Sequence, residues 1–178
     1  MSDPTILNLI RSRGSIRSYK DKTIPKQELL NIIESARLAQ SAANRQPWEF
    51  ILVTDPLTKN KLVGATRNQA FVSEAAAVIV CLASPERSTR VGPFEGFLID
   101  LAIAIENMVL TAWDEGIGSC WIGAFNEESV KELLDIPGHL RVVSLLTLGY
   151  PDEQPAGKYR KSLNEILHFE KYGNKKVL

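Results

Sequence analysis

The sequence has little of what most recognisable catalytic sites are built from. Two histidines, His139 and His168, and two cysteines, Cys81 and Cys120, are spread over 178 residues, and none has a partner at the spacing of a metal site. Cys120 has no histidine nearby in the sequence, which disfavours a cysteine nucleophile. P-loop, G-x-S-x-G and H-E-x-x-H motifs are also missing. The sequence therefore favours neither zinc, P-loop nor hydrolase chemistry.

The sequence also lacks net charge and a clear membrane or export segment. Its 21 Lys and Arg residues balance its 21 Asp and Glu residues, so no excess of basic charge favours nucleic acid or an anionic membrane. The N-terminus lacks the basic start and apolar stretch of an export signal. The most apolar stretch, residues 98–113, is short for a bilayer span and contains Asp100 and Glu106. We expect a cytoplasmic protein with reduced cysteines that binds neither nucleic acid nor membrane.

Enough apolar sequence is present for one buried core. Hydrophobic residues make up 44% of the chain, and no repeat, low-complexity segment or long linker divides it. We therefore expect residues 1–178 to form a single domain.

The pattern of apolar residues predicts alternating helices and strands. Helices are expected from about residue 6 to near Gly14, after Pro25 until near Ser41, and over 57–63, 97–113, 126–134 and 163–168. Strands are expected over 48–53, 76–83, 119–122 and 142–148. This order predicts a three-layer fold of the α+β or α/β class. The helix over 97–113 is apolar on most sides, which is typical of a central or interface helix.

Arg13, Ser15 and Arg17 form the first candidate site. In an extended segment these alternating residues project to one side. Two guanidinium groups and a hydroxyl on one face suit a phosphate group, because arginine binds phosphate through paired, charge-assisted hydrogen bonds. A solvated basic turn explains the same residues, and from spacing alone it is the better interpretation.

Two further segments could contact a planar ligand. Residues 41–48, between a helix and a strand, are rich in amide and hydroxyl groups that could bond the edge of a heterocycle, although a helix-capping loop explains them too. Residues 116–123 are not a dinucleotide-binding fingerprint, because Trp121 stands where the third glycine should be. Gly123 could still let a flat ligand approach the backbone, and packing alone explains the segment about as well. Phosphate-binding and amide groups without an acid, base or nucleophile fit a site where a cofactor performs the chemistry.

These segments together resemble the nitroreductase family of FMN enzymes. The matching stretches occur in order at 13–17, 41–48, 116–123 and 160–163. The resemblance implies an α+β fold with a central mixed or antiparallel sheet flanked by helices. It also implies an intertwined homodimer with two FMN sites, each built from both chains. The implied activity is reduction of nitroaromatics, quinones or similar electron-poor small molecules by NADH or NADPH, in a ping-pong scheme.

The resemblance further implies which residues bind FMN. Arg13 and Arg17 would reach the phosphate and nearby flavin atoms with help from Ser15, and Gly14 stands where the family often has a second basic residue. The partner chain would supply its loop, one of Asn68 and Gln69 would meet the pyrimidine edge, and no residue is expected to be catalytic because the chemistry occurs at flavin N5. The candidate cofactor-binding residues are Arg13, Gly14, Ser15, Arg17, Ser41, Ala42, Asn44, Gln46, Asn68, Gln69, Ile122, Gly123, Arg160 and Lys161.

Three alternatives stay open at this point. The same cofactor supports enone reduction or reductive dehalogenation in the family, and a flavin-binding protein could also serve storage or sensing without turnover. The residues do not choose among these activities. The apolar helix over 97–113 is expected at the dimer interface, with Leu101, Ile105 and Met108 at or near it.

Overall fold

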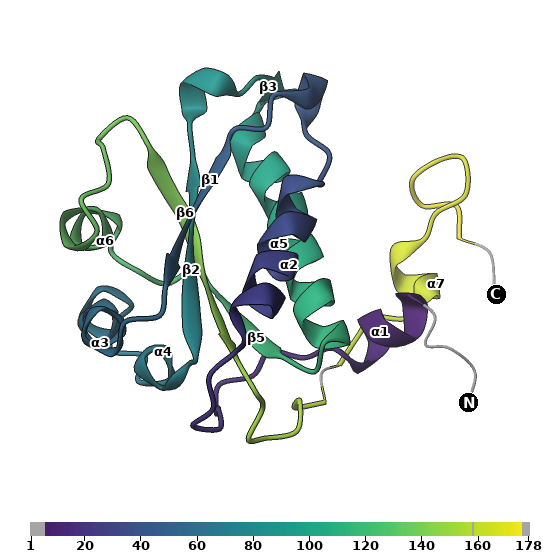
Figure 1. The fold of residues 1–178 in the computed structure, drawn as a ribbon. Coiled ribbons are helices and arrows are strands. Elements are labelled where there is room, and N and C mark those ends of the chain that lie inside the picture. Colours follow the sequence, from purple (N-terminus) through teal and green to yellow (C-terminus); the bar gives the residue numbers. More distant parts are fainter. Residues whose placement is uncertain (1–5, 158, 176–178) are drawn as a thin grey trace.

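A four-stranded antiparallel sheet forms the centre of the computed structural model, which describes residues 6–157 and 159–175 (Figure 1). The strand order is β1-β2-β6-β5. Its members are β1 (Trp48–Val53), β2 (Ala77–Ala83), β5 (Gly118–Ile122) and β6 (Arg141–Gly149). Each strand agrees with its sequence prediction to within one residue at either end. Because every pair of neighbours is antiparallel, the fold is α+β rather than α/β.

Helices cover both faces of this sheet, as the predicted three-layer arrangement requires. One face carries α2 (Lys26–Arg37) and α5 (Gly96–Asp114), and the other carries α3 (Pro56–Ala65), α4 (Phe71–Glu74) and α6 (Glu127–Leu133) (Figure 1). Two short helices, α1 (Ile6–Ser12) and α7 (Leu163–Ile166), lie beyond the α2/α5 layer. The sequence patterns did not predict α4, the one-turn helices η1 (Ala42–Asn44) and η2 (Pro85–Arg87), or the hairpin of β3 (Arg90–Val91) and β4 (Phe94–Glu95).

The central strand β2 is buried on both sides. Its residues Ile79 and Cys81 belong to the core under α2 and α5, whereas Val78 and Val80 belong to the core under α3 and α6. Successive side chains of a strand point to opposite faces, so one apolar run supplies both cores. This explains why β2 reads as a continuous apolar stretch in the sequence.

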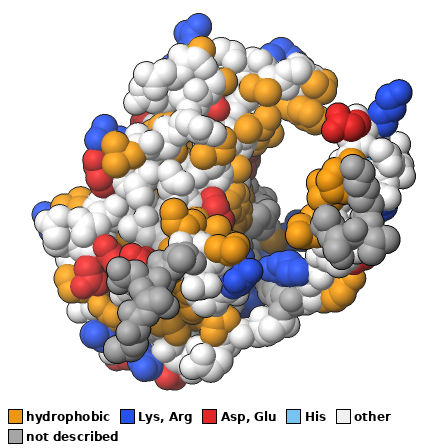
Figure 2. Space-filling model, turned by 90° about the vertical axis from the view of Figure 1, so that its right-hand side faces the viewer, with side chains coloured by type: hydrophobic (Ala, Val, Ile, Leu, Met, Phe, Trp, Pro, Cys, Tyr) orange, Lys and Arg blue, Asp and Glu red, His pale blue; other side chains and the backbone are white. Residues whose placement is uncertain are grey.

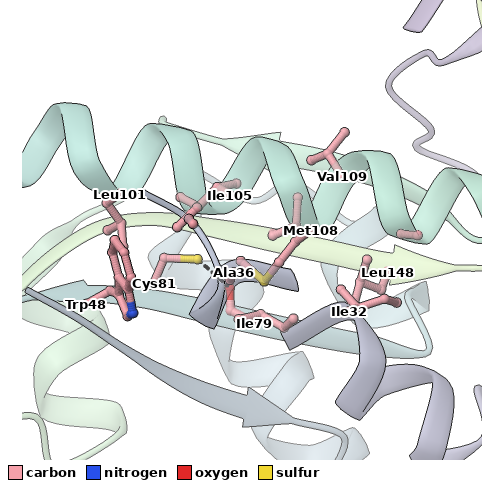
Figure 3. Packing of buried hydrophobic residues seen from close by; sticks show 14 of the residues in the cluster. Ile32, Ala36, Trp48, Ile79, Cys81, Leu101, Ile105, Met108, Val109 and Leu148 are labelled. Atoms are coloured by element: carbon pink, nitrogen blue, oxygen red, sulfur yellow. Dashed lines mark hydrogen bonds between the residues drawn. The ribbon is translucent and has the colours of Figure 1, made fainter. Parts of the chain in front are cut away.

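Helix α5 is a core helix of this chain. Leu101, Ile105 and Met108 are fully buried, and Figure 3 shows them pointing from α5 toward Trp48 and Ile79. These three residues were expected at or near a dimer interface; their burial within the chain rules out direct contact with a second chain, and whether they lie near an interface stays a prediction. By length and composition α5 could cross a membrane, yet half of its apolar window is buried inside the structure.

Two buried acids of high pKa predict a loss of stability in alkali. Burial raises the pKa of the Cys81 thiol from 9.0 to about 12, and burial also raises the pKa of the Tyr19 hydroxyl above its ordinary 10.0. Above about pH 9 the unfolded chain releases the thiol proton, and above about pH 10 it releases the tyrosine proton, whereas the folded chain keeps both. We expect the free energy of unfolding to fall as the pH rises through this window, by up to about 1.4 kcal/mol per pH unit for each group.

Urea unfolding at fixed protein concentration, at pH 8, 9 and 10, measures this effect. A Cys81→Ala variant should show a shallower alkaline decline than the parent, because one of the two groups is gone. Identical declines in the two proteins would contradict the assignment to Cys81.

Candidate functional site

The basic segment 13–17 runs beside the edge strand β5. Ser15 forms a parallel β-bridge with Ser119, and the Ile16 amide donates to the Ser119 carbonyl over 2.9 Å. Gly118 permits this approach, since a Cβ atom there would lie 2.7 Å from Ile16 Cγ1. The segment is thus extended at Ser15, as the alternating pattern predicted.

Two buried residues anchor this segment to the body. Ile16 is fully buried and packs with Tyr19 and Ala75. The Tyr19 hydroxyl donates to the Ile16 carbonyl over 2.7 Å and lies 2.7 Å from the Thr147 hydroxyl oxygen. Because Ile16 points inward, its neighbours Ser15 and Arg17 project to the opposite side, and Arg17 is exposed.

Arg13 and Arg160 meet at one cavity although 146 residues separate them in the chain. The cavity measures about 430 Å³, and Gly14 and Pro155 also line it. Within the described residues, neither guanidinium forms an ion pair with a carboxylate. Figure 2 shows basic side chains at the base of a hollow between the body and the segment that stands apart from it. Arg11 lines the cavity as well, and the Arg160 guanidinium also donates to the Tyr159 carbonyl over 3.2 Å. Guanidinium groups without a carboxylate partner, gathered at one cavity, suit a phosphate dianion.

Gly14 has a steric reason to be glycine here. It is buried, and a Cβ atom at this position would lie 2.3 Å from Pro155 Cβ. A larger side chain at this position would therefore displace the chain around Pro155. The cavity depends on this close approach of two segments.

Arg17 and Lys161 do not line this cavity. Arg17 is exposed, and its backbone N–H donates to the Glu153 carboxylate. Lys161 is likewise exposed. Both are close in sequence to cavity residues, but of the four basic residues expected at the phosphate only Arg13 and Arg160 line the cavity.

The turn at Asn68 and Gln69 lies beside the end of β5. Gln69 Nε2 donates to the Thr66 carbonyl over 2.8 Å and to the Ala124 carbonyl over 3.2 Å. The structure thereby brings Asn68 and Gln69 close to Gly123. Since the Gln69 amide is engaged within the chain while Asn68 is exposed, Asn68 is the better placed of the two to meet a ligand edge.

At the end of β5 the backbone, rather than a side chain, is accessible to a ligand. Ile122 is only 2% exposed and packs in the α3/α6 core, so its side chain does not face outward. Gly123 is exposed, and nothing within 4 Å would obstruct a Cβ atom there. A flat ligand could approach the backbone of these two residues, as the sequence suggested for Gly123.

The loop 41–46 lies far from the basic segment within one chain. The Ala42 amide donates to Asp100 Oδ1 over 2.9 Å near the start of α5, and Trp113 Nε1 donates to Ser12 Oγ over 2.9 Å at its end. Asp100 and Trp113 are thirteen residues apart on this helix, which corresponds to about 20 Å. Figure 1 shows η1 and α1 at opposite ends of the helical layer. A single chain does not bring Ser41, Ala42, Asn44 and Gln46 to the basic cavity.

Sequence reasoning missed three residues that shape these sites: Arg11, Pro155 and Asp100. Nothing in the spacing pairs Pro155 with Gly14. Asp100 carried a signal, because an acidic residue inside an apolar helix requires a hydrogen-bond partner if it is buried. Among the described residues, no group of three or more His, Cys, Asp or Glu could hold a metal ion.

Comparison with known proteins gives the following similarities. The sequence model of the Nitroreductase family matches residues 10–86 and 61–150. A nitroreductase family protein from Clostridium novyi NT has a similar crystal structure, with a TM-score of 0.81, 39% identity and 96% of each chain covered. The NADPH:FMN oxidoreductase from Vibrio harveyi complexed with NAD+ gives a TM-score of 0.87 at 26% identity, covering 96% of this chain and 79% of that one. An FMN reductase (NADPH) from Bacillus subtilis is 29% identical over 185 residues, covering 94% of this chain and 73% of the relative.

Proposed function

The chain belongs to the nitroreductase family, and on that premise we propose that it is an FMN-dependent oxidoreductase that passes electrons from NADH or NADPH to electron-poor small molecules. Relatives named as an FMN reductase (NADPH) and an NADPH:FMN oxidoreductase support the cofactor and the donor. The observation that carries the proposal is the cavity shared by Arg13 and Arg160, which suits the terminal phosphate of FMN.

The residues on the surface of the chain fit FMN. Arg13 and Arg160 would bind the phosphate, with Ser15 and Lys161 nearby. Asn68 would meet the polar edge of the ring, and the backbone at Gly123 would lie against it. When bound, FMN accepts and gives up hydride at N5, so the chain itself has to bind and orient rather than supply an acid or base.

A second copy of the chain completes this proposed site. Neither α1 nor α7 contains a buried residue, and both present apolar side chains to the surface. Helices of seven and four residues are unstable alone, so they need a packing surface. The exposed side chains on these helices and on the outer face of α5 are Ile6, Leu7, Ile10, Leu98, Ile99, Leu163 and Ile166. We propose that a second copy covers them and brings its loop 41–46 to the flavin.

The proposed acceptors, and the order in which donor and acceptor bind, follow if both use the same face of the flavin ring. Nitroaromatics and quinones are planar and electron-poor, so they can stack on a flavin with few specific contacts. The sequence has no separate dinucleotide motif, which favours donor and acceptor using the same face in turn. The protein is proposed to work in the cytoplasm, which agrees with two buried cysteines that form no disulfide with each other.

The purified protein should carry FMN and reduce it with NADH or NADPH. Flavin released by denaturation should be FMN rather than FAD, because the two arginines suit a terminal phosphate. Under anaerobic conditions the nucleotide should bleach the flavin, and an added nitroaromatic or quinone should restore its colour. Initial rates with both substrates varied should give parallel double-reciprocal lines.

Each part of this test can fail separately. Recovered FAD, or a protein that ignores added FMN, contradicts the cofactor. A bound flavin that neither nucleotide bleaches indicates binding without turnover. Intersecting lines contradict the alternating use of one site.

A further inference from the structure

The loop 41–46 has an unusual backbone. Ala43, Asn44 and Gln46 have φ angles of 51°, 54° and 48°, all in the left-handed region. Residues other than glycine are uncommon there, and such conformations persist only where the surroundings hold them. Three of them within four residues require contacts that fix the loop.

Asp100 supplies the buried contact. It is 2% exposed, and its Oδ1 accepts the Ala42 amide hydrogen over 2.9 Å. Further contacts are at the surface: Ser41 Oγ accepts the Gln46 amide hydrogen over 2.9 Å, Arg87 donates to the Gln46 carbonyl over 3.1 Å, and short-range hydrogen bonds within the loop join Asn44 to Ser41 and to Gln46. Asp100 therefore ties the start of the loop to the core helix α5.

Stability alone does not explain a carboxylate at this place. Among the described residues, Asp100 has no cation in ion-pair contact, and its Oδ2 is buried without a hydrogen-bond partner. Burying such a group opposes folding, and an apolar residue on this face of α5 would be less costly. The acceptor it offers to Ala42 is the one contact that such a replacement would lose.

We propose that Asp100 is a positioning residue for FMN binding. Through the Ala42 amide it holds the loop 41–46, with its three left-handed residues, in the conformation that presents Ser41 and Asn44 to the FMN bound by the second copy. This assignment rests on the proposed function and adds to it a residue that does not itself touch the cofactor.

Three substitutions separate positioning from stability. Asp100→Leu fills similar space without an acceptor, and Asp100→Asn keeps an oxygen that can accept from Ala42. Asn107→Ala removes another side-chain bond of α5, from Asn107 Nδ2 to the Ser35 carbonyl over 3.1 Å, away from the loop. FMN affinity is measured by titrating each apoprotein and following flavin fluorescence, and stability by thermal unfolding without FMN.

Asp100→Leu should bind FMN about tenfold to a hundredfold more weakly while its apoprotein unfolds at the parent's temperature or above. Asp100→Asn and Asn107→Ala should bind FMN within about threefold of the parent. If the parent binds FMN and the Asp100→Leu variant binds it equally well, the role of Asp100 is overturned but the proposed function is not. Equal losses in the Leu and Asn variants also overturn it, whereas a parent that binds no FMN overturns the proposed function as well.

Discussion

Replacing Arg13 and Arg160 together with alanine should lower the affinity for FMN by about a hundredfold to ten-thousandfold. A hydrogen bond to a charged group contributes about 1.5–3 kcal/mol, and the two arginines would each lose such a bond to the phosphate. Neither guanidinium pairs with a carboxylate among the described residues, so their removal leaves no buried charge unpaired. The fold should therefore survive. Fluorescence titration of the apoprotein with FMN measures the affinity, and thermal unfolding checks the fold.

Single substitutions and a control make this prediction specific. Arg13→Ala should weaken FMN binding more than Arg17→Ala, because Arg17 lies outside the cavity lining. Arg37→Ala is the matched control, since Arg37 is an exposed arginine paired with Glu34 on α2. A double variant that binds FMN within about threefold of the parent, or an Arg37→Ala variant with an equal loss, would count against the phosphate site.

The sequence was sufficient to predict the sheet and the main helices. Apolar runs bounded by turn residues marked both strands: β2 is buried along its whole length, and β1 is buried at its two ends and exposed only at Glu49. The elements that escaped prediction, α4 and the β3–β4 hairpin, have four residues and two residues per strand. Elements this short show little or no period, and the four-residue α7 was the one such element that was predicted.

Which side chains of helix α5 face the core was harder to predict than the helix itself. The stretch 97–113 is apolar on most sides, so its spacing does not say which residues face the chain's own sheet. The structure buries Ile105 and Met108 and exposes Leu98 and Ile99. The outward residues, rather than the buried ones, are available to a second chain.

The candidate site depended on contacts that spacing cannot show. Alternation placed Arg13 and Ser15 on one side of an extended segment, but it did not bring Arg160 to them. That meeting follows from the path of residues 151–157, where Tyr19 bridges Pro151 and the Asp152 amide donates to the Ser18 carbonyl. Only the family resemblance associated Arg160 with the phosphate in advance.

A mixed dimer of two flavin-deficient variants should regain FMN. One chain would carry Arg13→Ala with Arg160→Ala, and the other Ser41→Ala with Asn44→Ala. If each site takes its cavity from one chain and its loop from the other, every site of either parent homodimer has one defect. In the mixed dimer both defects fall on one site, and the second site has none.

The most direct measurement is the FMN content of this mixed dimer, purified through two different tags after co-expression. A dimer of two Arg13→Ala, Arg160→Ala chains carrying both tags is the control. A site shared between chains predicts about one FMN per mixed dimer and little in the control. A mixed dimer with no more FMN than either parent would contradict the shared site, because sites confined to one chain would all keep a defect.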